Sequence, residues 1–188
     1  MCTRRHLSTR TRILGVTIAV ALVAVVTASP APADPPGFDS GLGVPTIGDF
    51  NPVTLNGTNQ LTSAGITPFA VTDASGALAG WNVTLLVPDL RNGTGIDCAT
   101  NATASIGGAN VSMDAPVVTA ADGTTTMTGV TAAGFTDFTT PRKIVAAAAG
   151  DGAGTYDVAP AILNLIVPAN TIAGTYCTQA TIAITSGP

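Results

Sequence analysis

The residue types behind most hydrolytic and metal chemistry are scarce in this sequence. Its single histidine, His6, precedes the first apolar run, and all 11 acidic residues are aspartates because glutamate is absent. Ser–His–Asp and Cys–His catalysis require an imidazole, as does histidine-based zinc catalysis, and the chain beyond that run contains none. The composition therefore predicts a protein that is not an enzyme and needs no cofactor.

Paired aspartates are the remaining route to catalysis or metal binding. Two carboxylates would suffice for a glycosidase, but the aspartates are scattered and mostly occupy turns beside Gly, Ser or Asn. Asp151 and Asp157 flank the loop Asp151-Gly-Ala-Gly-Thr-Tyr-Asp157, whose carboxylates and carbonyls are ligand types that calcium accepts. We favour an exposed hairpin loop without metal at this position, with calcium as the alternative.

The N-terminus has the three parts of a secretory signal peptide. A basic stretch (Arg4, Arg5, Arg10 and Arg12) precedes the apolar run Ile13 to Val26, and Ala31-Pro32-Ala33 fits a cleavage site. We expect residues 1–33 to be removed, so that the exported chain begins at Asp34. The apolar run is shorter than the ~20 residues that span a bilayer, so we expect no retained transmembrane segment. A retained anchor is the alternative.

Removal of the signal peptide makes the chain strongly acidic. Three basic residues (Arg91, Arg142 and Lys143) then stand against eleven acidic ones, a formal charge of −8. Such a surface repels phosphate groups, which argues against a nucleic-acid partner. An anionic wall polymer would also be repelled unless local charges compensate.

Two cysteines remain in the exported chain. Cys98 and Cys177 form an even pair, which in an exported protein predicts a disulfide bond. Closing a loop of that span would stabilise the fold by about 4–5 kcal/mol in the chain-entropy model. The alternative, a thiol nucleophile or metal ligand, lacks a histidine partner.

The rest of the composition predicts one all-β domain. Thr, Val, Gly, Ala, Asn and Asp dominate, while the surface helix formers Glu, Lys and Gln are absent or rare. Residues 34–48 are rich in Pro and Gly and read as a flexible leader, and residues 49–188 are long enough for a single core. Short β-type runs separated by turn residues favour an immunoglobulin-like or Greek-key β-sandwich. The expected strands are 53–56, 67–72, 81–87, 102–106, 110–113, 125–131, 143–148, 161–167 and 176–185.

Two of these strands have a clear alternation of apolar residues. Trp81, Val83, Leu85 and Val87 share one face of the first, and Ala180, Ile182 and Ile184 share one face of the last. The simplest interpretation is that both faces pack into the core, with Trp81 lying over it.

The same strands resemble the conserved parts of the WxL family of cell wall-binding surface domains. Gly80-Trp81-Asn-Val83 follows Phe69-Ala-Val-Thr-Asp73, as in the proximal motif of that family. Val167-Pro-Ala-Asn170, Ala173-Gly-Thr-Tyr176, the alternating last strand and Gly187-Pro188 are similar to its C-terminal part. The glycine-rich 147–154 stands where the family often has a hairpin. The resemblance extends over 67–188 and is that of a divergent secreted member of actinobacterial type.

The resemblance implies a non-enzymatic β-sandwich that attaches non-covalently to the cell wall or cell surface. Trp81 and Val83 would match the first W-x-L motif, and Tyr176, Ile182 and Ile184 the second, as binding residues. Val83 replaces the leucine of the first motif, and the second has no tryptophan. The implied partner is peptidoglycan, another wall polymer or another surface protein. The alternative function is an assembly module that docks through an edge strand without binding glycan.

Overall fold

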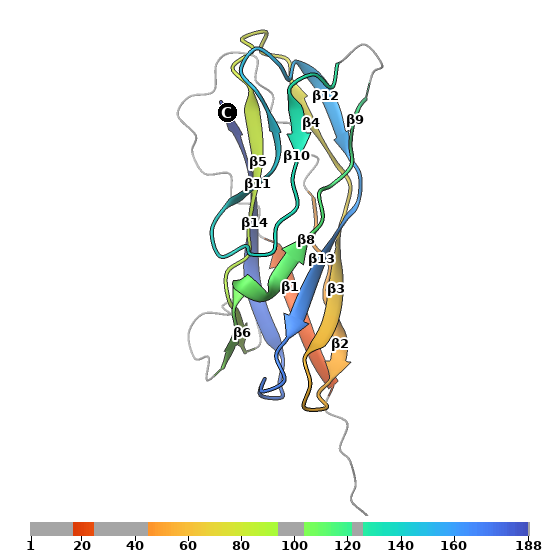
Figure 1. The fold of residues 1–188 in the computed structure, drawn as a ribbon, viewed down its shortest axis with the longest axis vertical. Helices are drawn as coiled ribbons and strands as arrows, with labels where there is room; N and C mark the ends of the chain where they lie inside the picture. The colour runs from red at the N-terminus through yellow and green to blue at the C-terminus, as the bar shows by residue number, and fades with distance from the viewer. Residues whose placement is uncertain (1–16, 25–44, 94–103, 122–125, 188) are drawn as a thin grey trace, which may run out of the picture.

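The computed structural model describes residues 17–24, 45–93, 104–121 and 126–187, and it shows a two-layered all-β fold (Figure 1). The first layer is an eight-stranded sheet. Its main path runs β10 (Val130–Ala132), β11 (Arg142–Ala147), β5 (Trp81–Leu86), β14 (Tyr176–Ser186), β1 (Thr17–Ala24) and β2 (Phe50–Thr54). The predicted β-sandwich is confirmed.

Strand β14 organises this first layer because different partners pair with its two halves. Residues Thr181–Ser186 pair antiparallel with β5, and Tyr176 and Cys177 pair with β6 (Leu90–Asn92). Strand β7 (Ser105–Ile106) extends the sheet beyond β6. Pro88 lies between β5 and β6, and a proline cannot donate a ladder hydrogen bond. One long strand therefore pairs along its length with two shorter ones.

The second layer consists of two three-stranded sheets placed end to end. One has the order β3 (Gln60–Ile66), β13 (Ala161–Val167), β8 (Val111–Met113), and the other β4 (Phe69–Asp73), β12 (Gly154–Val158), β9 (Val118–Ala120). A proline separates each strand of one sheet from its continuation in the other: Pro68, Pro160 and Pro116. The registers place these prolines at a similar level, because Ala161 pairs with Ile66 and Val158 with Phe69 and Val118. We call these three residues the proline row.

The core lies between the layers and follows the two-residue period of the strands. In β13, Leu163, Leu165 and Val167 are buried, while Ile162 and Ile166 are exposed. Burying side chains of this size contributes about 1.5–3 kcal/mol each. The largest fully buried side chains are Trp81, Tyr156, Tyr176, Phe50, Phe138, Leu85, Leu90, Ile106, Ile144, Leu163 and Leu165.

Two residues just before the predicted domain boundary at residue 49 pack against β3. Ile47 is buried and forms a β-bridge with Ile66, and Gly48 N donates to the carbonyl of Gly65 at 2.9 Å. The last residues of the predicted leader therefore belong to the packed domain. Residues 34–44 lie outside the described part of the chain, so the flexible character of that part stays a prediction.

Strand β1 lies within the segment predicted to be a signal peptide. It pairs parallel with β14 and antiparallel with β2 when residues 1–33 are present. Its β-branched and small apolar residues suit a strand as well as a signal peptide. Removal of residues 1–33 on export stays a prediction.

Candidate functional site

The two strands that carry the motif residues are neighbours in the first layer. Antiparallel pairing of β5 with β14 sets Val83 opposite Ile184, Leu85 opposite Ile182 and Trp81 opposite Ser186. Four of the five predicted binding residues are therefore brought together. Tyr176 lies apart from them, at the other end of β14.

These motif residues are buried. Trp81, Val83 and Tyr176 are 0% exposed and Ile182 is 1% exposed, while Ile184 is half-buried at the edge of the core. The predicted core-facing orientation of both strands is confirmed. In this conformation, Trp81, Val83, Tyr176 and Ile182 do not offer their side chains to a polymer at the surface. Their role as binding residues stays a prediction, and any such role would act through the shape of the domain.

Trp81 is fixed by the glycine-rich loop between β11 and β12. Its Nε1 donates to the carbonyl of Gly152 at 2.9 Å, and its ring lies 5.5 Å from that of Tyr156 at an interplanar angle of 53°. The Tyr156 hydroxyl donates towards the carbonyls of Thr126 and Ala153 at 3.0 and 3.1 Å. Each ring thus satisfies its polar atom inside the core, as buried polar groups require.

Gly152 and Gly80 occupy positions whose backbone conformation and surroundings both favour glycine. Gly152 has φ +86°, and a Cβ there would lie 2.7 Å from Trp81 Nε1 and 2.4 Å from Ala147 Cβ. Gly80 has φ +77°, and a Cβ there would lie 2.6 Å from the carbonyl oxygen of Ala147. Both positions need the left-handed backbone that glycine adopts at low cost and the space that a side chain would fill.

Polar contacts fasten the end of β14 to the start of β5. Gly187 N donates to the Gly80 carbonyl at 2.8 Å, and Asn82 Nδ2 donates to the Gly187 carbonyl at 2.8 Å. The Thr185 hydroxyl donates to Asn82 Oδ1 at 3.0 Å. Asn82 is only 6% exposed, so these bonds compensate the cost of burying its amide.

Tyr176 and Cys177 begin β14 in a separate environment. The Tyr176 hydroxyl donates to the Ile172 carbonyl at 2.8 Å, and burial raises the pKa of its phenol above the usual 10.0. Cys177 is 3% exposed, with its Sγ 3.8 Å from the Gly93 carbonyl oxygen. Cys98 lies outside the described residues, five positions after Gly93, so the disulfide stays a prediction.

The two aspartates weighed as calcium ligands lie on different elements. Asp151 lies in the loop before β12, where its N–H donates to the Ala148 carbonyl at 3.0 Å. Asp157 is exposed on β12, opposite Ala70 and Thr119. Within the described ranges there is no group of three or more His, Cys, Asp or Glu side chains able to hold a metal. The choice between a metal-free loop and a calcium site at Asp151 and Asp157 stays a prediction.

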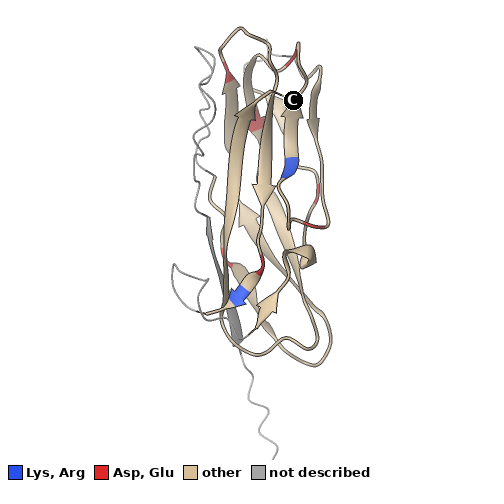
Figure 2. Cartoon of the chain, turned by 90° about the vertical axis from the view of Figure 1, so that its left-hand side faces the viewer, with Lys and Arg blue, Asp and Glu red and all other residues tan. Residues whose placement is uncertain are grey.

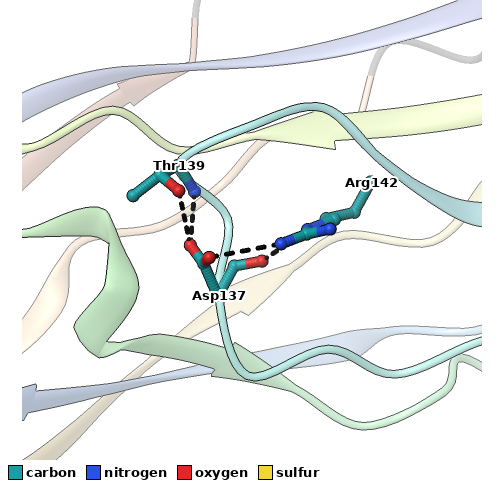
Figure 3. A network of polar contacts seen from close by, with 3 residues as sticks. All are labelled: Asp137, Thr139 and Arg142. Atoms are coloured by element: carbon teal, nitrogen blue, oxygen red, sulfur yellow. Dashed lines mark hydrogen bonds and ion pairs between the residues drawn. The ribbon is translucent and has the colours of Figure 1, made fainter.

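Asp137, Thr139 and Arg142 form a polar network at the start of β11 (Figure 3). Asp137 Oδ1 accepts from the backbone N–H and the hydroxyl of Thr139 at 2.8 and 2.7 Å, and Oδ2 pairs with Arg142 Nη2 at 3.2 Å. The Thr139 hydrogen bonds, followed by the Arg142 charge, lower the pKa of Asp137 below 3.8. Arg142 also lies over the Phe135 ring, 5.7 Å from its centroid. One of the few basic groups is therefore already paired.

The outward side of the β3–β13–β8 sheet carries exposed apolar side chains beside a few polar ones and no charged residue, and we call it the outer face. The register places Leu61 opposite Ile166, Asn164 between Ser63 and Ser112, and Ile162 opposite Gly65. Leu61, Ile162 and Ile166 are 69%, 59% and 43% exposed. The sequence did not reveal this surface, because β3 has a weak β pattern; the alternation of β13 was its only signal.

Charged residues elsewhere are few (Figure 2). Long stretches of strand in both layers carry neither basic nor acidic residues. Two shallow hollows flank the proline row. One, of about 320 Å³, is lined by Pro68, Phe69, Thr119 and residues 157–159, and the other, of about 500 Å³, by residues 112–115 and 134–136. Neither brings together a pair of carboxylates suited to hydrolysis.

Comparison with known proteins assigns the family. Curated proteins give no match to this sequence. In the described residues, no helix is long and apolar enough to cross a membrane. A family model described as "WxL domain surface cell wall-binding" matches residues 52–188, a range that contains both motif strands, the Trp81 loop and the outer face. The chain therefore belongs to the WxL family of surface cell wall-binding domains.

Proposed function

We propose that this protein is an exported, non-catalytic domain that attaches non-covalently to the cell wall. The observation that carries the proposal is the family match over residues 52–188. The buried aromatic residues give the domain a rigid fold, and the absence of histidine and glutamate from the chain after residue 33 favours binding over catalysis.

We propose the outer face as the surface that contacts the wall polymer. Exposed apolar groups on a sheet are typical of interaction surfaces, and here they flank the polar row Ser63, Asn164 and Ser112. None of the three strands contains a charged residue. The charge of −8 expected for the processed chain disfavours a polyanion such as a teichoic acid. A glycan of low charge density, such as peptidoglycan, therefore suits this face better.

Co-sedimentation of the exported protein with isolated Gram-positive cell walls tests wall binding. We expect pelleting that persists at high salt, because contacts between uncharged groups are little affected by screening. Walls stripped of anionic polymers should bind at least as much protein. If the protein stays in the supernatant on both kinds of wall, the proposed function is wrong.

Matched charge substitutions test the contact surface. Ile166→Asp places a carboxylate on the central strand of the outer face, opposite Leu61, while Ile172→Asp adds the same charge at an exposed position (57%) in the loop between β13 and β14. We expect Ile166→Asp to weaken wall binding about tenfold or more and Ile172→Asp to leave it near wild type. Equal binding by both variants, at unchanged unfolding midpoints, would exclude the outer face.

A further inference from the structure

Strand β1 fills a space between two strands that do not pair with each other. It forms a parallel ladder with β14 over Val20–Tyr176 to Ala24–Ala180, and an antiparallel ladder with β2 at Thr17–Thr54, Ile18–Val53 and Val20–Phe50. Figure 1 shows β1, in red, beside β2 at the lower end of the fold. Within the described residues, β2 has no other ladder partner. We call the space between β14 and β2 the strand slot.

Removal of residues 1–33 would empty the strand slot. The backbone N–H and C=O groups of β14 and β2 that face β1 would lose their partners, and such groups are costly when left unpaired in a core. Phe50, Tyr176 and Ala180 pair with β1 residues and are at most 2% exposed in the full chain. The processed domain would thus have a gap lined by apolar side chains and by two strand edges.

Both walls of the slot are held by contacts that do not involve β1. On one side, the Thr62 hydroxyl donates to the Asn51 carbonyl at 2.5 Å, and Asn51 Nδ2 donates to the Ser63 carbonyl at 3.4 Å, which ties β2 to β3. On the other side, Tyr176 and Cys177 pair with β6. The slot would therefore persist in the processed chain.

The leader is a poor replacement for β1. A strand between two neighbours needs backbone donors along its whole length, which proline lacks, and glycine weakens a strand. The sequence Asp34-Pro-Pro-Gly-Phe-Asp-Ser-Gly-Leu-Gly43 contains two prolines, three glycines and two aspartates. Thr17-Ile-Ala-Val-Ala-Leu-Val-Ala24 contains none of these.

We propose that the strand slot of the processed protein accepts an extended segment from a second exported polypeptide. The segment would add as a strand parallel to β14 and antiparallel to β2. Its chemistry follows from the slot: about eight residues without proline or charge, and small or branched apolar residues where they meet Phe50, Tyr176 and Ala180. The proposal rests on removal of residues 1–33 and is independent of wall binding.

Exchange of strand β1 in the folded full chain tests the slot. A specific protease site is inserted between Ala33 and Asp34, the folded protein is cut, and a labelled peptide with the sequence of Thr17–Ala24 and terminal lysines is added in excess. We expect the cut segment to stay bound until the labelled peptide displaces it. The peptide should then elute with the domain at one copy per chain and restore the unfolding midpoint after the cut segment is washed away.

A Val20→Pro version of the peptide is the control. Val20 pairs with both Tyr176 and Phe50, so proline there should weaken binding about tenfold or more. If the cut segment leaves at once, the unfolding midpoint does not change and neither peptide binds, the slot closes by itself and the proposal is wrong. Sequencing the N-terminus of the exported protein is a second check, because retention of residues 17–24 would also overturn the proposal.

Discussion

At the scale of single residues, Trp81-Asn-Val83, the counterpart of the first W-x-L motif, packs inside the core. Trp81 is enclosed by the core, donates its N–H to Gly152 and contacts the Tyr156 ring. The glycine before it, Gly80, allows the backbone to pass close to Ala147. Burial of the Trp81 ring thus requires a residue without a side chain at position 80, which explains why a glycine precedes the tryptophan.

Gly152→Ala should destabilise the domain by about 2–4 kcal/mol, because the new Cβ would collide with Trp81 and the backbone φ is positive. Gly150→Ala is the matched control: its φ is +94°, but no atom lies within 4 Å of the added Cβ. The control should lose only about 1–2 kcal/mol, the cost of a left-handed residue with a side chain. Urea unfolding of both variants measures the difference, and equal losses would show that the contact with Trp81 is unimportant.

Asp137→Asn should reduce stability at neutral pH and have little effect in acid. The pKa of Asp137 is lowered in the folded state, so its charge stabilises the fold above the unfolded-state pKa, and that stabilisation is lost as the pH falls through the folded-state pKa. The difference in unfolding midpoint between wild type and variant should therefore shrink from about pH 6 to about pH 2. Thermal unfolding across that range measures it. A difference that is independent of pH would mean that the ionised form of Asp137 is not the stabilising one.

At the scale of the strands, buried and outward-facing side chains alternate, and we expect only the buried ones to contribute strongly to stability. Ile182 is 1% exposed, while Thr181 on the opposite side of β14 is half-buried. Ile182→Ala should cost about 2–4 kcal/mol through lost burial and a cavity. Thr181→Ala should stay within about 0.5 kcal/mol of wild type. Denaturant unfolding compares the two, and a larger loss at Thr181 would reverse the assigned faces.

The sequence predicted the strands whose apolar residues alternate most strongly. The expected 81–87, 161–167 and 176–185 correspond closely to β5, β13 and β14. The burial of Trp81 also followed from its position at the start of such a strand. Local pattern was sufficient here because each strand has one buried and one more exposed face.

Other strands were missed for identifiable reasons. In β3, the inward residues include Thr62 and Ala64, so the face that packs on the core does not look apolar in the sequence. β12 begins at Gly154 and contains Asp157, and the glycines before it indicated a loop. β9 has only three residues. The outer face and the strand slot share a different reason for not being predictable from the sequence. Both depend on which distant strands become neighbours in the fold.

At the scale of the whole molecule, β14 links the two ends of the first layer, and the predicted disulfide would reinforce one of them. Peptide mapping of the oxidised protein should recover Cys98 joined to Cys177. Reduction of this bond should lower the free energy of unfolding by about 2–5 kcal/mol. A Cys98→Ser and Cys177→Ser double variant should be equally destabilised and no longer respond to reductant. Free thiols in the oxidised protein would contradict the pairing.

The proline row gives the second layer a crease. On either side of it, the strands form separate hydrogen-bonded ladders on β13 and on β12, and prolines cannot carry a ladder across the break. Under shear, strand separation that begins between β3 and β13 would thus stop at the proline row, because the β4–β12 ladder is separate from the β3–β13 ladder. Half of the layer could yield while the half beside Trp81, whose ring contacts Tyr156 of β12, stays closed.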